Sequence, residues 1–386
     1  MKKKLLITSS TFPRWENDNE PRFILDIAKA LLVYYDVTVL APISPGAKEY
    51  EILEGIKVVR YHYFPIAYFE TLCAPGAIVQ RIKEKKWRIF LIPFLGVSLY
   101  LYLAKHIKEY DLTIANWIIP QGVIHSLLKS KYILVCHGSD VTSFNKGIVR
   151  TLKKRALKKA SSVIVVSEHL KKQVLKLVPT IDVHVNPLGC DTKKFSVDNT
   201  RKDYFAQFEK KIILFVGRLE EIKGVTYLIN AMQFIRDAIL VIVGDGTQKA
   251  LLEEQAIKID KTILFLGAKS HNELSEIFAS ADIFVMPSVT TKNGSQEGFG
   301  LVLVEAMASG LPVVASQCGG IVDIVRDGEN GYLVEEKNSF QIADKVNTIL
   351  ENDELYKKMS KAARNSAEYY DYTNVAERYY DILKNI

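Results

Sequence analysis

The sequence alternates short apolar runs with helical patterns, and this alternation restricts the chain to one class of fold. Residues 4–9 form an apolar run that ends in a loop, and apolar side chains at helical spacing follow between residues 23 and 31. Further runs of this kind lie at residues 37–40, 112–115, 133–136 and 163–166. Alternation of strands and helices builds a parallel sheet covered by helices. The sequence therefore predicts a doubly wound α/β domain.

The same order of runs restarts after a polar stretch at residues 196–210. The later runs lie at residues 211–216, 239–243, 262–266, 283–286 and 313–315. A chain of 386 residues is also too long for one ordinary core. We therefore predict two Rossmann-like domains, residues 1–198 and 199–369, and expect a C-terminal helix at about 370–386 to pack back on the first. Because ligands bind beyond the carboxyl ends of such strands, we expect the domains to face each other across a cleft.

Composition and cysteine spacing indicate a protein of a reducing compartment. Hydrophobic residues make up 48% of the chain and the net charge is +7, which fits a globular protein with anionic partners. The widely spaced cysteines, with no Cys-x-x-Cys pair, predict reduced thiols: Cys73, Cys136, Cys190 and Cys318. The apolar run after Lys4 is too short for a signal-peptide core. The apolar stretch 89–104 contains Pro93 and Gly96 and is shorter than the roughly 20 residues that cross a bilayer, so we expect no membrane span.

Two glutamates lie eight residues apart where a glycine-containing loop enters an apolar helix, in the segment 296–310. Glu297 is on the loop, where it can hold sugar hydroxyls, and Glu305 is in the first turns of the helix, where it can accept bonds from a ribose diol. The backbone amides at this helix start form a natural diphosphate site: Gly298, Phe299, Gly300, Leu301 and Val302. The alternative is a helix cap at Glu297 and a solvated Glu305. The apolar neighbours of Glu305 favour the functional interpretation.

A second loop carries two cations five residues apart. Arg218 and Lys223 follow the apolar run 211–216 and could clamp the diphosphate of a leaving group. Without other evidence, they could equally form surface salt bridges with Glu220 and Glu221. The glutamate motif in the same predicted domain favours the diphosphate role.

These two segments together resemble glycosyltransferase family 4. The family carries two glutamates separated by seven residues and a Gly-Arg-Leu…Lys-Gly loop, both of which match here, and the resemblance covers nearly the whole chain. It continues in the segments 166–168, 186–195 and 243–246. The resemblance implies the GT-B fold, a donor held mainly by the C-terminal domain, retention of anomeric configuration and no essential metal. The sequence agrees on the metal, since no Asp-x-Asp follows an apolar strand and the acidic run 16–20 lacks the glycine and distal glutamate of a calcium loop.

The resemblance also assigns roles in the first predicted domain. His137 follows the apolar run 133–136 and is implied to lie at the reacting centre, so that we take His137 and Glu297 as the catalytic residues. Asp140 is an acceptor-side or orienting group, and Trp117 and Glu20 are placed on the acceptor side. A histidine that only caps a loop remains the alternative. Since no residue stands out as a covalent nucleophile with a partnered base, we expect front-face displacement assisted by positioning and electrostatics.

Basic and aromatic residues flank the apolar stretch 89–104. Arg81, Lys83, Lys85, Lys86 and Arg88 precede it, and the runs 150–159 and 171–176 add to the basic surface of the same domain. This composition fits contact with an anionic membrane and a lipid-linked acceptor. The alternative is a solvated helix face beside a buried one. No nucleic-acid-binding signature is present, so we expect no nucleic-acid partner.

The sequence therefore predicts a cytoplasmic glycosyltransferase, peripheral at the inner membrane face, that moves a sugar from a UDP- or GDP-sugar to a lipid-linked or polysaccharide acceptor. The nucleotide sugar is a substrate, and no cofactor or metal is expected. One alternative is a glycogen-synthase-like or disaccharide-forming transferase acting on a soluble acceptor. The other is a non-catalytic nucleotide-sugar-binding protein of the same fold.

Overall fold

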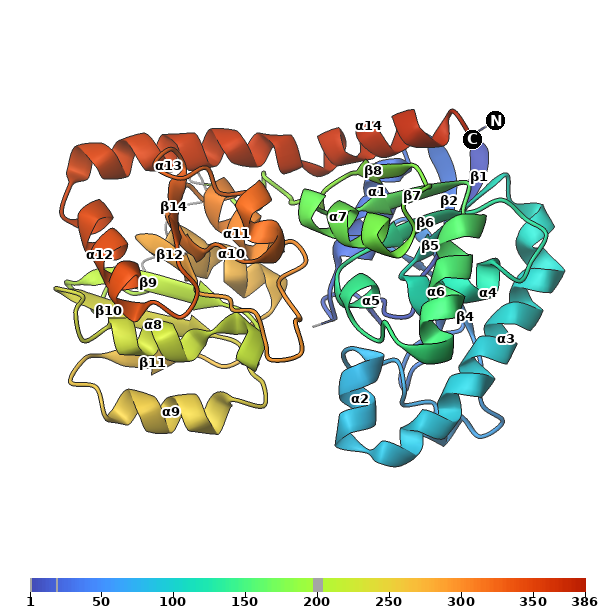
Figure 1. Cartoon of the computed structure of the whole chain (residues 1–386), viewed down its shortest axis with the longest axis horizontal. Helices are drawn as coiled ribbons and strands as arrows, with labels where there is room; N and C mark the ends of the chain where they lie inside the picture. The colour runs from blue at the N-terminus through green and yellow to red at the C-terminus, as the bar shows by residue number, and fades with distance from the viewer. Residues whose placement is uncertain (1, 19, 197–203) are drawn as a thin grey trace. The chain divides into compact units, whose positions relative to one another are not determined.

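The computed structural model describes residues 2–18, 20–196 and 204–386, which divide into two compact units (Figure 1). The first unit comprises Met1–Asn186 and Val375–Ile386, and the second comprises Pro187–Asn374. The predicted boundary, between residues 198 and 199, lies outside the described residues. The units separate earlier because the segment after Asn186 packs into the second unit, where the Phe195 ring lies 5.6 Å from that of Phe278.

The first unit is built on an eight-stranded sheet. Its strands are β1 (Lys3–Thr8), β2 (Tyr35–Pro42), β3 (Tyr50–Leu53), β4 (Ile56–Tyr61), β5 (Leu112–Asn116), β6 (Ile133–Cys136), β7 (Ser162–Val165) and β8 (Val183–Val185). The spatial order is β3-β4-β2-β1-β5-β6-β7-β8, and every pair is parallel except β3 with β4. The predicted runs form β1, β2, β5, β6 and β7, whereas β3, β4 and β8 were not predicted.

Helices connect these strands. They are α1 (Phe23–Leu31), α2 (Ile78–Glu84), α3 (Leu91–His106), α4 (Val123–His125), α5 (Ser139–Thr142), α6 (Gly147–Lys159), α7 (Glu168–Leu177) and the C-terminal α14 (Tyr372–Leu383). Short helical turns are η1 (Ala67–Phe69), η2 (Lys86–Phe90), η3 (Ile107–Glu109) and η4 (Ile118–Gly122).

The alternation of side chains along β1 places helices on both faces of this sheet. Leu5 and Ile7 point to one face, where they join a buried cluster with residues of α1 and α14. Leu6 points to the other face and joins a cluster with Leu91 and Leu95 of α3. Because successive side chains of a strand alternate sides, the apolar part of β1, Leu5 to Ile7, is buried on both faces of the sheet.

The second unit is built on a six-stranded parallel sheet. Its strands are β9 (Lys211–Val216), β10 (Ala238–Val243), β11 (Ile263–Phe265), β12 (Ile283–Met286), β13 (Val313–Ser316) and β14 (Gly331–Val334), in the order β11-β10-β9-β12-β13-β14. Its helices are α8 (Val225–Ala231), α9 (Lys249–Ile257), α10 (His271–Ala279), α11 (Leu301–Ala308), α12 (Ser339–Leu350) and α13 (Asp353–Ala367), with turns η5 (Glu221–Lys223), η6 (Gly319–Asp323) and η7 (Glu368–Tyr370). Both the α/β class and the paired Rossmann-like sheets are confirmed.

Each sheet has one point where the strand order reverses. The chain builds outward from β1 on one side and returns to β5 on its other side, and β9 stands in the same way between β10 and β12. At such a point two neighbouring loops leave the carboxyl ends of the strands in opposite directions, which leaves room for a ligand. The loops after β1 and β5 and those after β9 and β12 flank these two points, and the loops after β6 and β13 are next along the same edges. These loops are the places to look for a site.

One helical stretch differs from the expectation about membrane spans. Residues Lys86–Glu109 form a continuous helical stretch of 24 residues with a mean hydropathy of 1.6 in its most apolar window, long and apolar enough to cross a membrane. The length argument from the sequence was therefore wrong, because the helix extends beyond the apolar run on both sides. One side of this stretch is nevertheless packed in the core of the first unit, through Leu91, Leu95, Leu99 and Leu103.

Candidate active site

The second unit brings together two residues that the sequence assigned to different tasks. Lys223 ends η5 in the loop after β9, and Glu297 lies in the loop between β12 and α11. Lys223 Nζ donates to Glu297 Oε2 at 2.5 Å, and each side chain is about 15% exposed. A lysine and a carboxylate held together at a partly open sheet edge form a charged centre that a polar ligand can reach.

Glycines let the backbone come close around this ion pair. Gly319 and Gly320, in the loop after β13, pack on the loop of Glu297, and Gly320 N donates to Glu297 O at 2.9 Å. A Cβ on Gly319 would lie 2.0 Å from that carbonyl oxygen, and Gly319 has φ = 57°. Gly224, next to Lys223, would place a Cβ 2.0 Å from Pro287 O. A side chain at Gly319 would displace the backbone of Glu297, and one at Gly224 would push the Lys223 loop away from Pro287.

A side-chain network braces the same loop. Thr290 donates from its backbone nitrogen and from Oγ1 to Glu336, at 2.6 and 2.7 Å. Gln296 Nε2 donates to Thr290 Oγ1 at 2.8 Å, immediately before Glu297. The sequence analysis identified neither this network nor the Gly319–Gly320 pair, although a Gly-Gly pair shortly after the apolar run 313–315 was a visible signal.

The predicted diphosphate segment lies where a helix begins. Gly300 takes the left-handed conformation, with φ = 100°, and is the N-cap of α11. Phe299 and Gly300 are buried, whereas Gly298, Leu301 and Val302 are partly exposed. The amide end of this helix therefore lies at the carboxyl edge of the sheet, next to the loop of Glu297.

The remaining residues predicted for the donor differ in exposure. Arg218 follows β9 and has an exposed side chain. Glu305, on α11, is 5% exposed. The charge of Glu305 adds to the effect of burial in raising the pKa of the Cys190 thiol, which places the two groups close together. Glu305 is thus enclosed in the unit, where the sequence left open a solvated carboxylate.

In the first unit, His137 is held in one tautomer. His137 Nε2 lies 2.9 Å from Asn116 Oδ1, and Asn116 Nδ2 donates to Thr8 O at 3.2 Å. Because the amide nitrogen must face the Thr8 carbonyl, its oxygen accepts a hydrogen bond from Nε2, which therefore carries the proton. Burial lowers the pKa of His137 to about 3, so the ring is neutral at ordinary pH. Asn116 thus has a defined structural role, because its side-chain amide fixes the tautomer of His137.

The second ring nitrogen of His137 is left as an acceptor. Nδ1 is enclosed and, among the described residues, has no hydrogen-bond partner. The ring lies between Trp117, at 5.0 Å between centroids, and Phe23, at 5.2 Å. Trp117 itself has φ = 68°, an uncommon conformation for a bulky residue. A neutral imidazole with a free lone pair can accept a hydrogen bond from a hydroxyl group.

Asp140 is engaged by the backbone of its own loop and of a neighbouring one. Its Oδ1 accepts from the amides of His137, at 3.1 Å, and Gly138, at 2.8 Å, while Oδ2 accepts from Ile118 N at 3.2 Å. Burial raises the pKa of this carboxyl, and the three amide bonds act in the opposite direction. With its oxygens occupied in this way, Asp140 fits an orienting role for the His137 loop better than direct contact with an acceptor.

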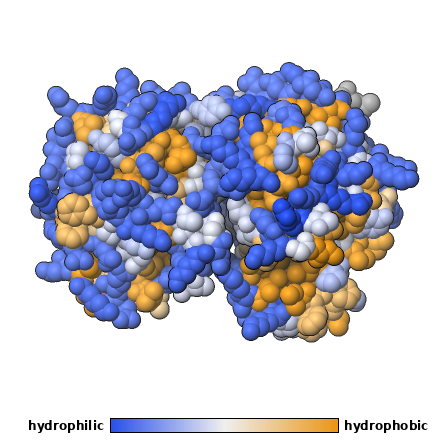
Figure 2. Space-filling model, in the orientation of Figure 1, coloured by the Kyte–Doolittle hydropathy of each residue, from blue (hydrophilic) through white to orange (hydrophobic). Residues whose placement is uncertain are grey.

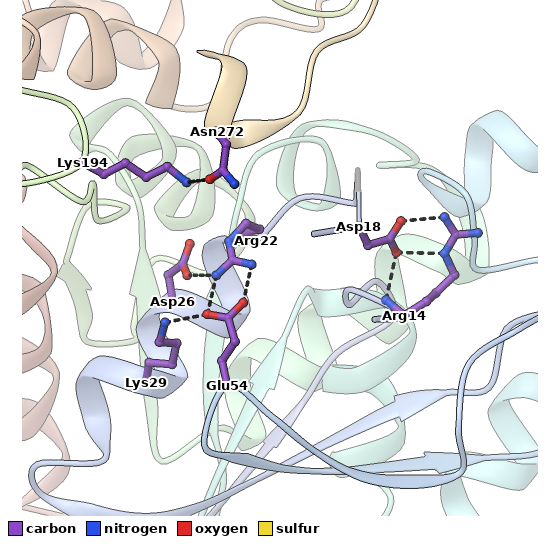
Figure 3. A network of polar contacts seen from close by, with 8 residues as sticks. All are labelled: Arg14, Asp18, Arg22, Asp26, Lys29, Glu54, Lys194 and Asn272. Atoms are coloured by element: carbon purple, nitrogen blue, oxygen red, sulfur yellow. Dashed lines mark hydrogen bonds and ion pairs between the residues drawn. The ribbon is translucent and has the colours of Figure 1, made fainter. Parts of the chain in front are cut away.

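Glu20 is buried in the loop after β1. Its Oε1 accepts from Gly76 N at 2.7 Å, and its Oε2 has no partner among the residues described. Burial raises the pKa of this carboxyl. Figure 3 shows the ion pairs on either side of it: Arg14 with Asp18, and Arg22 with Asp26 and Glu54. These pairs fix the ends of the loop, with Arg22 held to the β3–β4 turn at 2.6 Å.

Sequence reasoning missed Lys153, which lies within the predicted basic surface run 150–159. Lys153 is fully buried on α6, and Nζ donates to the carbonyl oxygens of Val141 and Ser143, each at 2.8 Å. A third bond runs to Asn145 Oδ1 at 2.6 Å. Burial lowers the pKa of this amine to about 8. Lys153 therefore braces the loop that follows His137 and contributes no surface charge, which corrects the expectation for this run.

The structure thus brings the predicted residues together in two groups, one in each unit. The first contains His137, Asp140 and Trp117 at the ends of β5 and β6, and Glu20 lies apart from these in the β1 loop. The second contains Lys223, Glu297 and the start of α11, with Arg218 on the same loop as Lys223.

Two parallel-sheet units with polar groups at both points of strand reversal define a glycosyltransferase with the GT-B fold, and the chain is similar to known members of that class. The family model of Glycosyltransferase Family 4 matches residues 21–194, and that of Glycosyl transferases group 1 matches residues 196–366. The two models account for most of both units in series. The chain belongs to this family of glycosyltransferases.

Solved structures and sequence relatives agree with this assignment. Sucrose-phosphate synthase from Thermosynechococcus elongatus has a TM-score of 0.80 at 20% identity, covering 100% of this chain and 99% of that one. The Anabaena protein HepE in complex with UDP and glucose has a TM-score of 0.77 at 20% identity, covering 100% of both chains. At such identities these likenesses establish the fold.

The sequence relatives include a glycosyltransferase of Methanocaldococcus jannaschii, 28% identical over 87% of this chain and 86% of its own. A phosphatidyl-myo-inositol mannosyltransferase of Mycobacterium leprae is 35% identical over 46% of this chain and 47% of its own. The relatives of this chain thus include an enzyme that, by its name, acts in glycolipid synthesis.

Proposed function

We propose that this chain is a retaining, metal-independent hexosyltransferase that uses a nucleotide diphosphate sugar, UDP- or GDP-linked, and a lipid-linked or polysaccharide acceptor. The observation that carries the proposal is the Lys223–Glu297 pair beside the start of α11. Cations and helix amides recognise a diphosphate, and a carboxylate at the same edge can hold the hydroxyls of the attached sugar. One protein that shares the fold supports it, since HepE was solved with UDP and glucose and with UDP-glucose.

In the proposed reaction the bond between the anomeric carbon and the diphosphate oxygen breaks, and the electron pair leaves with the nucleoside diphosphate. The acceptor hydroxyl oxygen bonds to the same face of the sugar, and its proton passes to the departing phosphate oxygen. Lys223 and Arg218 would stabilise the charge that develops on this oxygen, which reduces the need for a metal ion.

We assign Glu297 to the sugar hydroxyls and Glu305 to the ribose, as the family resemblance implies. His137 would accept a hydrogen bond from a sugar hydroxyl through Nδ1, because Nε2 already donates to Asn116. Asp140 and Asn116 would orient the imidazole without touching substrate. Trp117 and Glu20 remain the proposed acceptor-side residues.

The proposed place of action is the cytoplasmic face of a membrane. The M. leprae relative, which by its name acts on a phosphatidylinositol, supports a lipid-linked acceptor. The second candidate is a disaccharide-forming reaction on a soluble acceptor, which the shared fold of sucrose-phosphate synthase supports.

The test is thermal unfolding with UDP, GDP, ADP and their sugar conjugates in the presence of EDTA. A ligand at 100 times its dissociation constant stabilises by about 2.7 kcal/mol, which raises the midpoint by several degrees. Donors that stabilise the protein are then incubated with lipid-linked and soluble acceptors, and the anomeric configuration of the product is read by NMR. Stabilisation by no nucleotide would overturn the proposal and leave the non-catalytic alternative, whereas an inverted product or a need for metal would overturn its respective part.

A further inference from the structure

We infer that the outer face of α3, together with η1 and η2, is a surface that inserts shallowly into an anionic membrane with α3 lying in the membrane plane. This insertion face consists of Phe90, Phe94, Val97 and Leu101 with the adjoining Tyr68, Phe69 and Trp87. It deepens the proposed function, since its use in reaching a lipid-linked acceptor rests on that function.

Two apolar stripes run along opposite sides of α3. Leu91, Leu95, Leu99 and Leu103 recur every fourth residue and are buried in the core of the unit. Phe90, Phe94, Val97 and Leu101 recur at intervals of three and four and are exposed, with 73% of Phe90 and 61% of Leu101 accessible. At 3.6 residues per turn these stripes face away from each other. A surface helix of a soluble protein carries polar residues on its outer side, so the second apolar stripe needs another explanation.

Ring contacts join this stripe to the neighbouring turns. Tyr68 contacts Phe69 at 5.4 Å between centroids, and Phe69 contacts Trp87 of η2 at 5.6 Å. Phe64 links Phe69 to Phe94 of α3, at 6.1 and 5.0 Å. The exposed apolar residues therefore form one continuous surface. Figure 2 shows hydrophobic side chains gathered over the part of the first unit that carries α2, η2 and α3.

The distribution of charge identifies an anionic membrane as the partner. Residues 89–104 contain no Asp, Glu, Lys, Arg or His. The exposed charges that flank this stretch are mostly lysines: Lys83, Lys85 and Lys86 with Glu84 before it, and Lys105 and Lys108 with Glu109 after it. Both flanks are therefore net positive. Apolar and aromatic groups that enter the acyl boundary, with cations at the level of the headgroups, are the pattern of an interfacial helix. A symmetric contact with a second copy would bring two net positive surfaces together, which disfavours a dimer.

The packing of α3 distinguishes insertion from spanning. Crossing the bilayer would withdraw the four buried leucines from Leu6 and Leu40 of the sheet and expose that core. Lying in the plane keeps these contacts and uses only the side that solvent now reaches. The stripe from Phe90 to Leu101 is roughly 17 Å long at 1.5 Å per residue, which suits one side of a helix at the interface.

The test uses the full chain and sedimentation with phosphatidylcholine vesicles containing about one third phosphatidylglycerol. The triple variant Phe90→Gln, Val97→Gln, Leu101→Gln replaces exposed apolar groups by a residue that favours helix, so the fold is kept. We expect its partition coefficient to fall by at least about tenfold. The matched control, Leu251→Gln, Ile257→Gln, Phe340→Gln, changes equally exposed residues of the second unit and should bind vesicles as the original chain does.

A second arm tests the charges. Lys83→Gln, Lys85→Gln, Lys86→Gln should weaken binding to the anionic vesicles by about fivefold per lysine, and added salt should weaken the binding of the original chain. The melting temperature and the stabilisation by a nucleoside diphosphate serve as readouts of folding and of the donor site, and neither should change in any of the three triple variants.

The inference is overturned if the original chain fails to bind these vesicles, or if the apolar variant binds them equally well. It is also overturned if light scattering shows a dimer that the apolar variant dissolves while vesicle binding persists. If only the proposed function is wrong, the chain still binds vesicles through this face, but no nucleotide stabilises it. Failure of the surface alone leaves nucleotide binding and transfer to a water-soluble acceptor intact.

Discussion

At the carboxyl edge of its sheet the second unit carries an ion pair, Lys223 with Glu297, whereas the first unit carries a neutral imidazole between two aromatic rings. The charged pair is partly exposed and lies beside a helix N-terminus. The imidazole is held by Asn116, and its pKa is lowered to about 3 by burial. The same place in two similar folds is thus suited to different chemistry, because a polyanion needs cations and amides while a hydroxyl needs a neutral acceptor.

The largest effect that this comparison predicts is on Glu297. In Glu297→Gln the side chain keeps its size but no longer balances Lys223, which should misplace the amine and weaken the hold on the sugar. We expect kcat to fall by roughly 10³-fold, as when a preorganised electrostatic group is removed, while a nucleoside diphosphate still stabilises the fold. Steady-state kinetics and thermal shifts measure the two. Glu221→Gln, an exposed carboxylate on the Lys223 loop, is the control and should leave kcat unchanged; a loss in the control of the same size would show that the pair has no special role.

His137 tests the neutral half of the comparison. His137→Ala removes the acceptor nitrogen Nδ1 and should lower kcat by about 10²-fold, with little change in the affinity for a nucleoside diphosphate. His184→Ala, on the short strand β8, removes a partly exposed imidazole and is the matched control. An effect of His137→Ala confined to nucleotide affinity would contradict the division between the two units.

Lys153 gives a smaller effect through the loop that follows His137. Lys153→Met preserves the aliphatic stem but leaves the carbonyls of Val141 and Ser143 without their donor. We expect about a tenfold loss of kcat and faster amide hydrogen exchange in residues 138–145. Lys158→Met, exposed on the same helix, should change neither. Unchanged exchange in the Lys153 variant would show that this amine does not position the loop.

The sequence was sufficient for the sheets because their central strands are buried on both faces and read as apolar runs, as β1 and β9 do. It was insufficient for β3, in which only Leu53 is buried, and for β8, which has three residues. The short edge elements take their conformation from a neighbouring strand, so their own pattern is weak.

In the candidate site, too, some features could be predicted from the sequence and others could not. Glu297 and Lys223 could be identified from motif spacing, but their contact depends on loops joined by tertiary packing around Gly319 and Gly320. Lys153 looks like any residue of a lysine-rich helix, since burial of a charged group follows from what surrounds it. The partnership of His137 with Asn116 also lay beyond the sequence, because it joins the ends of two different strands.

The last predicted effect is on the stability of the first unit, which should depend on pH through its buried histidines. His125, fully buried beneath Thr8, has a pKa lowered to about 3 by burial, while an unfolded histidine titrates near 6.5. Between these values the unfolded chain binds a proton that the folded unit does not, so the stability present above about pH 6.5 is lost as pH falls. This group should reduce the unfolding free energy of the first unit by up to about 1.4 kcal/mol per pH unit.

Tryptophan fluorescence reports on the unfolding of the first unit, because Trp15, Trp87 and Trp117 all belong to it. Urea unfolding followed by this signal at pH 7, 6 and 5 should show the decline. His125→Asn should reduce its slope by about half, because burial lowers the pKa of His137 in the same unit in the same way; an equal decline in the variant would assign the pH dependence to other groups.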